Sequence, residues 1–258
     1  MKAKLTAIAV SSILIAFPNF THAATQVPWV DNGVRWTHYY NPDVRADHTL
    51  YDGIPTDSVT TSPTWAAGSF SAGSVAEVSE NFLRIGTAAS DGSRTFRQSN
   101  GYDLGTSASS FTLEARFRVT ALNADATYAG SFLFGTGTNG RWGEILYSQT
   151  SIGGATGLDL TDWTLVRFTI TGATTSAPLV SIFVNGSQTA NATMTLTAAA
   201  TLAYFQIGDG STASFTGGVS EWDYLRWTNE GAYAPIPEPS SLALLGVASL
   251  YAVVRRKK

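Results

Sequence analysis

The chain has 258 residues, of which 44% are hydrophobic and 14% are charged, and its formal net charge is −3. It contains no cysteine, which excludes disulfides and every metal site that is built from thiolates. No internal repeat is detectable, so the arrays and solenoids that repeats build are not expected.

The first 23 residues have the three parts of a secretory signal peptide. Lys2 and Lys4 give a positive start, residues 5–17 are apolar, and Thr21-His22-Ala23 supplies the small residues of a cleavage site. We therefore expect a signal helix, export through the Sec machinery and cleavage after Ala23. Residues 1–23 are set apart from the folded domain.

The charge of the chain changes once its two ends are set aside. Six of its sixteen cations, including all four lysines, and one of its nineteen acids lie in residues 1–23 and 235–258. About 210 residues remain, which is enough for one core, and they carry 10 arginines against 18 acids, a net charge of −8. An acidic surface without lysine argues against nucleic acid and anionic lipid as partners. It is compatible with a neutral polymer or a divalent cation.

Residues 24–69 are the least regular part of the predicted domain. Residues 33–40 favour a strand, which Asn41-Pro42-Asp43 ends, and the rest has the composition of loops. Acidic side chains gather near His48 in this stretch; they are Asp43, Asp47, Asp52 and Asp57. We interpret them as a solvated acidic loop, with calcium binding as the alternative.

Residues 70–234 show the period-two alternation of β-strands and no convincing amphipathic helix. In residues 111–119 every odd position is apolar and every even position is polar, which indicates an antiparallel sheet with one buried face. The predicted strands are 81–87, 94–98, 111–119, 132–134, 142–147, 163–171, 180–184, 203–207 and 219–228. The first two are expected to form a hairpin, and Asn185-Gly186 predicts a second hairpin with a two-residue type I′ turn. The pattern predicts one all-β, antiparallel sandwich.

The order of these strands resembles that of the laminin G-like and concanavalin A-like jelly-roll family. Five stretches are similar to successive family strands: residues 111–115, 163–166, 182–186, 207–208 and 218–227. The resemblance implies a jelly-roll domain over residues 70–228, and it places Trp163 in the core.

Some jelly rolls of this class cleave glucans with carboxylates on a Glu-x-Asp-x-(x)-Glu strand. In this chain Glu221 and Asp223 are expected to share a face, but Leu225 and Arg226 stand where the general acid is needed. The sequence has no His-Glu-x-x-His and no Gly-x-Ser-x-Gly motif. We therefore expect a protein that is not an enzyme.

Aromatic and acidic residues in loops are the candidates for ligand and metal binding. Trp142 lies beside Asn139 and Arg141 at the rim of a glycine-rich loop, where an indole can stack on a sugar. A purely structural Trp142 is the alternative. Asp209, between two glycines, is the first candidate for a calcium ligand and Asn185 is a weaker one. Both residues also suit turns without a metal.

Residues 235–258 join Pro-Ile-Pro-Glu-Pro, an apolar run and a basic end. Residues 242–254 would form a helix of about 20 Å, shorter than the ~30 Å hydrocarbon core, so they suit transient membrane insertion with a cytoplasmic C-terminus. The tail resembles the PEP-CTERM sorting tail, with its motif at Pro237, Glu238, Pro239, Arg255 and Arg256. That resemblance implies recognition and cleavage by an exosortase in a Gram-negative envelope. An ordinary tail anchor is the alternative.

These features together predict an exported cell-envelope or extracellular-matrix protein with one non-catalytic jelly-roll domain that binds polysaccharide. Two alternatives stay open, a secreted glycan hydrolase or lyase of the same class and a purely structural matrix protein.

Overall fold

The structure is a computed structural model. It describes residues 29–31, 33–40, 65–70, 74–79, 82–87, 94–98, 102, 104–105, 107–137, 140–199, 201–209 and 216–236. These ranges contain no α-helix, and none of their segments is a helix long and apolar enough to cross a bilayer. The expected signal helix and the apolar run at 242–254 lie outside them.

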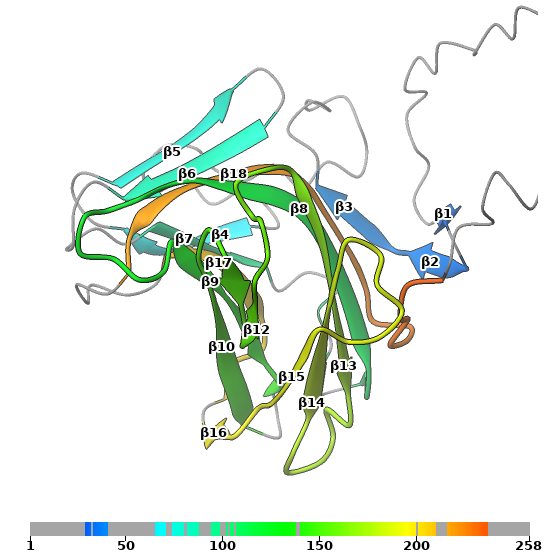
Figure 1. Ribbon diagram of the computed structural model, residues 1–258. Helices are drawn as coiled ribbons and strands as arrows, with labels where there is room; N and C mark the ends of the chain where they lie inside the picture. Colours follow the sequence, from blue (N-terminus) through cyan, green and yellow to red (C-terminus); the bar gives the residue numbers. More distant parts are fainter. Residues whose placement is uncertain are drawn as a thin grey trace, which may run out of the picture.

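Two eight-stranded antiparallel sheets form the sandwich in the described part of the chain (Figure 1). Sheet I has the order β15 (Ala192–Thr195), β14 (Leu179–Val184), β13 (Thr164–Thr171), β8 (Phe111–Leu122), β18 (Gly218–Thr228), β6 (Phe82–Thr87) and β5 (Ser74–Ser79), and β3 (His38–Tyr40) also pairs with β18. Sheet II has the order β12 (Ala155–Thr156), β11 (Ser151–Ile152), β10 (Arg141–Tyr147), β9 (Gly130–Gly135), β17 (Phe205–Asp209), β7 (Arg94–Gln98) and β4 (Trp65–Phe70), and β16 (Ala198–Ala199) also pairs with β10. A small hairpin of β1 (Trp29–Asp31) and β2 (Val34–Trp36) lies on the side of sheet I that faces away from sheet II.

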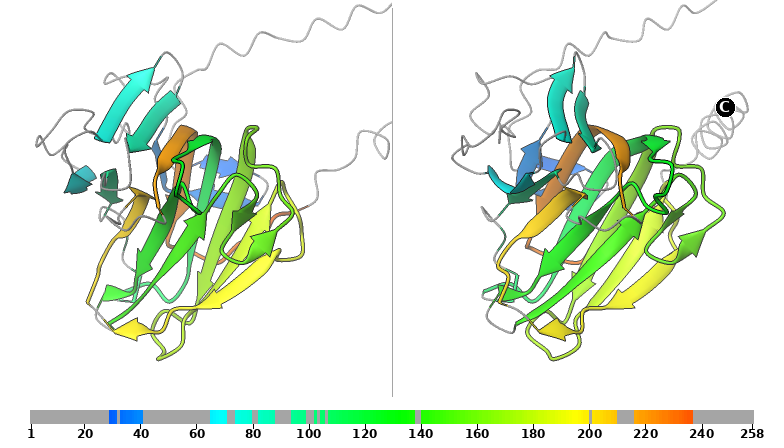
Figure 2. Two further views of the ribbon diagram at one scale, coloured as in Figure 1. Left: turned by 60° about the vertical axis from the view of Figure 1, so that its left-hand side comes forward. Right: turned by 90° about the vertical axis from the view of Figure 1, so that its left-hand side faces the viewer.

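The core lies between the two sheets, where aromatic rings from both sides meet. The apolar residues of β8 alternate inward and have no exposed surface, as their pattern predicted; they are Phe111, Leu113, Ala115, Phe117 and Val119. Phe132 of sheet II packs on Phe168 of sheet I with 4.5 Å between ring centroids, and Trp222 stacks on Phe117 at 4.8 Å. The prediction of an all-β sandwich is confirmed, and Figure 2 shows its two layers from further directions.

Consecutive strands cross from one sheet to the other, which makes the sandwich a jelly roll. β6 lies in sheet I, β7 in sheet II, β8 in sheet I, and β9 with β10 in sheet II. The predicted hairpin between residues 81–87 and 94–98 is therefore wrong, although both strands exist. β6 pairs with β5 and β18, whereas β7 pairs with β4 and β17. Both strands bury apolar residues in the same core from opposite sides, so alternation alone could not distinguish a crossing from a hairpin.

The turn at Asn185-Gly186 is confirmed, but it does not make a two-residue hairpin. Both residues have positive φ, 50° and 74°, and the Ser187 amide donates to the Val184 carbonyl at 3.1 Å. Beyond the turn, Asn191 makes the next two hydrogen bonds with β14. Its amide donates to Ile182 O, and its Oδ1 accepts from the Val184 amide. For this reason β15 begins only at Ala192.

Candidate functional site

The outer face of sheet I, which faces away from sheet II, carries charged and aromatic side chains. The alternation that buries the odd residues of β8 points Glu114, Arg116 and Arg118 outward. A register shift between Trp222 and Tyr224 changes the alternation of β18. As a result Trp222 and Leu225 are both buried in the core, while Tyr224 and Arg226 reach the outer face beside Glu114.

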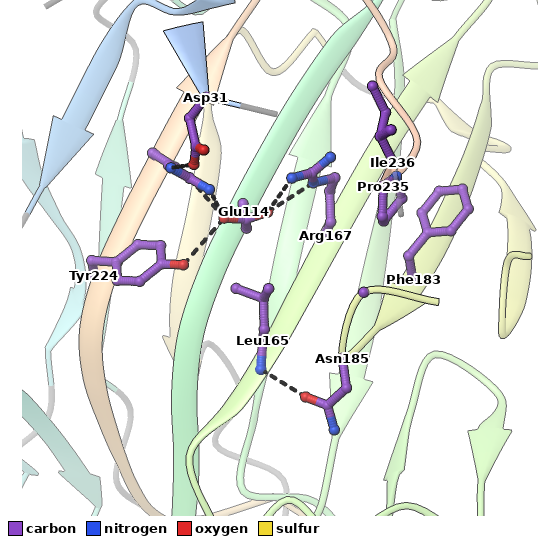
Figure 3. A pocket seen from close by; sticks show the side chains of 11 residues that line it. Asp31, Glu114, Leu165, Arg167, Phe183, Asn185, Tyr224, Pro235 and Ile236 are labelled. Atoms are coloured by element: carbon purple, nitrogen blue, oxygen red, sulfur yellow. Dashed lines mark hydrogen bonds and ion pairs between the residues drawn. The ribbon is translucent and has the colours of Figure 1, made fainter. Parts of the chain in front are cut away.

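A cavity of about 480 Å³ opens on this face, and we call it the outer pocket (Figure 3). Its walls come from five strands, the turn after β14 and the segment that leaves β18. The lining residues are Asp31, Glu114, Leu165, Arg167, Phe183, Asn185, Gly186, Tyr224, Arg226, Pro235 and Ile236.

Glu114 is the centre of the charged wall, and it is fully buried. Its Oε2 accepts hydrogen bonds from Nε and Nη2 of Arg167, at 2.8 and 2.5 Å. Its Oε1 accepts from Nε of Arg226 at 2.7 Å and from the Tyr224 hydroxyl at 3.1 Å. Arg226 also donates to Oδ2 of Asp31 at 2.7 Å. Two cations and two anions thus compensate one another in one hydrogen-bonded network, as a buried carboxylate requires.

The hairpin of β1 and β2 covers part of this network through Trp36. The indole of Trp36 is fully buried, and the guanidinium carbons of Arg226 and Arg167 lie 4.4 and 5.4 Å from the centre of a Trp36 ring. These cation–π contacts hold both arginines against the hairpin. The charged wall is therefore a fixed arrangement.

The network also shifts the pKa values of Tyr224 and Arg226. Burial raises the pKa of Tyr224 well above its usual value, and the neighbouring Glu114 charge raises it further. Burial by itself disfavours the charged form of Arg226, but Glu114, Tyr224 and Asp31 together outweigh burial, and the pKa of Arg226 is raised. Tyr224 and Arg226 therefore remain hydrogen-bond donors at physiological pH.

Residues 229–236, which we call the exit segment, turn back over the outer face after β18 and end at the pocket. The Thr112 hydroxyl donates to Gly231 O at 2.7 Å and accepts from the Tyr233 amide at 2.9 Å. Arg167 Nη1 donates to Tyr233 O at 3.4 Å, and Arg35 pairs with Glu230. The last two residues, Pro235 and Ile236, form one wall of the pocket (Figure 3).

Further along the outer face, Trp163 packs with two arginines of β8. The guanidinium carbons of Arg118 and Arg116 lie 4.6 and 5.4 Å from a Trp163 ring centre. The predicted place of Trp163 in the core is therefore wrong. Thr164 opens β13 and is buried opposite Phe117, so the residue before it faces outward.

The two carboxylates of the glucanase-like strand share the outer face, as predicted. Glu221 is paired with Arg118 at 2.6 Å, and Asp223 is paired with Arg116 at 2.5 Å. Neither residue lines the outer pocket.

The predicted sugar site lies on sheet II. Trp142 is partly exposed on β10, opposite Gly135 of β9 and Ala198 of β16. The Arg141 guanidinium donates to Ser176 O and Thr197 O at 3.1 and 3.5 Å, so it links the loop before β14 to the segment before β16. Asn139 lies outside the described residues. Trp142 and Arg141 therefore both lie on β10 of sheet II, and neither lines the outer pocket.

The two calcium candidates lie on different sheets. Asp209 ends β17 and is 2% exposed, and Asn185 lines the outer pocket while its Oδ1 accepts from the Leu165 amide at 3.1 Å. Within the described ranges, no three His, Cys, Asp or Glu side chains gather in a way that could hold a metal. The acidic cluster around His48 lies outside those ranges, as do Ala23, Pro237, Glu238, Pro239, Arg255 and Arg256.

Sequence reasoning did not find the Glu114 network, although a signal for it exists. Arg167 and Arg226 are the direct cross-strand partners of Glu114 on β13 and β18. Opposite charges at polar positions of three strands would have indicated the network, provided that the order and register of those strands were known.

Comparisons with known proteins give one match to a family model and several similar solved structures. Residues 235–258 match the family model of the PEP-CTERM protein-sorting motif, and no curated protein matches the chain. Among solved structures, the chain is similar to an endo-1,3-beta-glucanase from Streptomyces sioyaensis, with 12% identity, a TM-score of 0.43, and coverage of 78% of this chain and 98% of the other. A carbohydrate esterase from Shiga toxin-encoding bacteriophage phi24B has 15% identity, a TM-score of 0.43, and coverage of 64% and 89%.

The metal-free exoplasmic/lumenal domain of VIP36 is a third similar structure, with 9% identity, a TM-score of 0.42, and coverage of 76% and 93%. At these identities the likeness concerns the fold alone. The tail is more specific, because its motif is one that implies export and processing by an exosortase. The chain is a jelly-roll protein that carries a PEP-CTERM protein-sorting motif at residues 235–258, the mark of an exported, envelope-associated protein.

Proposed function

We propose that the mature protein is a non-catalytic component of the cell envelope or extracellular matrix, and that its sandwich binds polysaccharide in the outer pocket. The observation that carries this proposal is the pocket, with its fixed polar wall around Glu114 and its apolar wall around Phe183 and Ile236. Binding sites commonly combine such an apolar lining with a few convergent polar groups.

The chemistry of the two walls suits a sugar. Hydroxyl groups can accept from the arginines and donate to carboxylate or amide oxygens, while the C–H face of a sugar ring can pack on Phe183 and Ile236. Because Arg167, Arg226 and Tyr224 are already held by Glu114, they lose little conformational entropy when a ligand binds.

The charge of the pocket favours a neutral polysaccharide over a strongly anionic one. Two arginines face two carboxylates, Glu114 and Asp31, so the charged groups that line the pocket sum to zero. The net charge of −8 outside the terminal segments adds no attraction for a polyanion.

The carboxylates around the pocket support binding rather than hydrolysis. Glycoside hydrolysis needs one carboxyl group as an acid and another as a base or nucleophile. Five carboxylates on the outer face and on the segments that cover it each form an ion pair with an arginine. They are Asp31, Glu114, Glu221, Asp223 and Glu230. Each of these carboxylates is already held by an arginine, so none is presented to a ligand as an unengaged acid or base.

A glycan array probed with the mature protein from its native cells tests the proposal. Leu165→Trp places an indole in the pocket without removing any member of the ion-pair network, so binding should fall at least about tenfold. Trp142→Ala is the control for the rival site on sheet II, and it should leave binding unchanged.

Loss of binding in Trp142→Ala alone would move the site to sheet II. A correctly folded protein that binds no glycan would contradict the proposal and favour a purely structural role. Each array is run with calcium and with a chelator, because a calcium ion at Asp209, or less favourably at Asn185, remains our proposal. A requirement for the ion would support calcium binding, and equal binding would count against a role for calcium in glycan binding.

A further inference from the structure

The exit segment connects the folded domain directly to the sorting motif. Its last residue, Ile236, lines the outer pocket, and the next residue along the chain is Pro237 of the Pro-Glu-Pro motif. The motif therefore follows the exit segment with no residue between them.

The exit segment is held on the sandwich by its backbone. Thr112, which is fully buried, accepts from the Tyr233 amide and donates to Gly231 O. Arg167 adds a hydrogen bond to Tyr233 O, and the Arg35–Glu230 ion pair fixes the start of the segment. At the other end of the segment, the side chain of Ile236 lies close to Gly33. A Cβ atom added to Gly33 would lie 2.9 Å from Cδ1 of Ile236.

These contacts occupy backbone groups a few residues upstream of the motif. Enzymes and receptors that take an extended peptide commonly hydrogen-bond its main chain on either side of the recognised residues. While Gly231 and Tyr233 are bonded to Thr112, their bonded backbone groups are not available for such contacts.

We propose that the docked exit segment limits the rate of tail removal. The processing enzyme acts on a state in which Gly231 and Tyr233 have left Thr112, and it cuts the chain at the Pro237-Glu238-Pro239 motif. In that step one peptide bond breaks, its carbonyl carbon passes to water or to an amine or hydroxyl acceptor, and its nitrogen leaves with the tail as a protonated amine. The proposal rests on processing of the tail by an exosortase and adds a structural control to it.

Pulse–chase labelling of the full-length precursor in its native cells tests this control. Thr112→Val keeps the shape of the side chain and removes both hydrogen bonds, so the precursor should be processed faster by on the order of tenfold. Thr112→Ser keeps the hydroxyl and should match the natural protein. Arg35→Gln removes the ion pair with Glu230 and should accelerate processing about twofold, since that pair is largely exposed.

Equal processing rates for the Val and Ser variants would overturn the proposed control. That result would leave the sorting assignment intact. A natural precursor that is never cut would instead overturn the sorting assignment and this proposal together. If Thr112→Val fails to accumulate as folded protein, the processing rate of Arg35→Gln tests the control in its place, and an unchanged rate in that variant counts against the proposal.

Discussion

Glu114 and Arg226 are cross-strand neighbours on β8 and β18, and Oε1 of Glu114 lies 2.5 Å from Nη2 of Arg226. Neither charge is well solvated, because the Glu114 side chain has no exposed surface and that of Arg226 is 12% exposed. Arg167 reaches the other carboxylate oxygen from β13, on the opposite side of β8. One carboxylate therefore links three adjacent strands on the outer face of sheet I.

Removal of this carboxylate charge should strongly destabilise the fold. In Glu114→Gln two buried guanidinium groups lose their common anion, and breaking a buried pair in this way costs about 3–5 kcal/mol of unfolding free energy. Denaturant unfolding followed by tryptophan fluorescence measures the change. Asp223→Asn is the matched control, since its partner Arg116 is 44% exposed and such pairs contribute at most about 1 kcal/mol. Similar losses in both variants would contradict the central role of Glu114.

Substitution of Trp222 in the core and of Trp163 on the outer face should lower the free energy of unfolding by different amounts. Trp222 is fully buried and stacks on Phe117, so Trp222→Ala should cost about 3–5 kcal/mol of unfolding free energy. Trp163 packs on Arg118 at the outer face, and Trp163→Ala should cost only about 1 kcal/mol. Chemical denaturation of both variants gives the comparison. An equally large loss for Trp163→Ala would return that residue to the core, where the family resemblance had placed it.

The core of β8 could be predicted from sequence because a period of two fixes which residues share a face. Phe111, Phe117 and the apolar residues between them all follow that rule. The same rule fails where the alternation changes its phase. The register shift before Tyr224 reverses a side chain, and it has no local signature in the sequence. Trp163 obeys the rule, because it alternates with the buried residues Thr164 and Val166, and only the family resemblance placed it in the core.

The outer pocket could not be predicted because its residues are far apart in the chain. Arg167 and Arg226 follow Glu114 by 53 and 112 residues, and only the strand order brings them together. A local hairpin rule also misplaced β7, which pairs with β4 and β17 rather than with β6. Sheet membership is decided by which partner buries most apolar surface across the whole chain, and a local pattern does not contain that information.

Alkaline pH should weaken the fold through its buried tyrosines. Burial raises the pKa of Tyr102, Tyr147 and Tyr224 above the usual value of about 10, and the charges of Asp209 and Glu114 add to the effect at Tyr147 and Tyr224. Their stabilisation is therefore fully present below about pH 10 and is lost as the pH rises from there toward the folded-state values.

Denaturation midpoints measured between about pH 8 and pH 11 should fall steadily above pH 10. Tyr147→Phe cannot ionise at this position, so its slope should be smaller by up to about 1.4 kcal/mol of unfolding free energy per pH unit. Its hydroxyl bond to Ser220 is lost at every pH, which lowers the whole curve without changing its slope. A flat profile for the natural protein would contradict the effect of burial on these three groups.

The sorting motif should be needed for the protein to leave the membrane. Pro237→Ala together with Glu238→Ala removes a fixed φ angle and a negative charge, while the apolar run and basic end stay unchanged. We expect a full-length precursor that remains with the membrane, detected by cell fractionation and by intact mass. Asp125→Ala, an exposed change in a loop of the sandwich, is the control and should be processed normally. Unchanged secretion and mass in the double variant would favour an ordinary tail anchor, because Arg255 and Arg256 would then act as a cytoplasmic stop rather than as part of a cleavage signal.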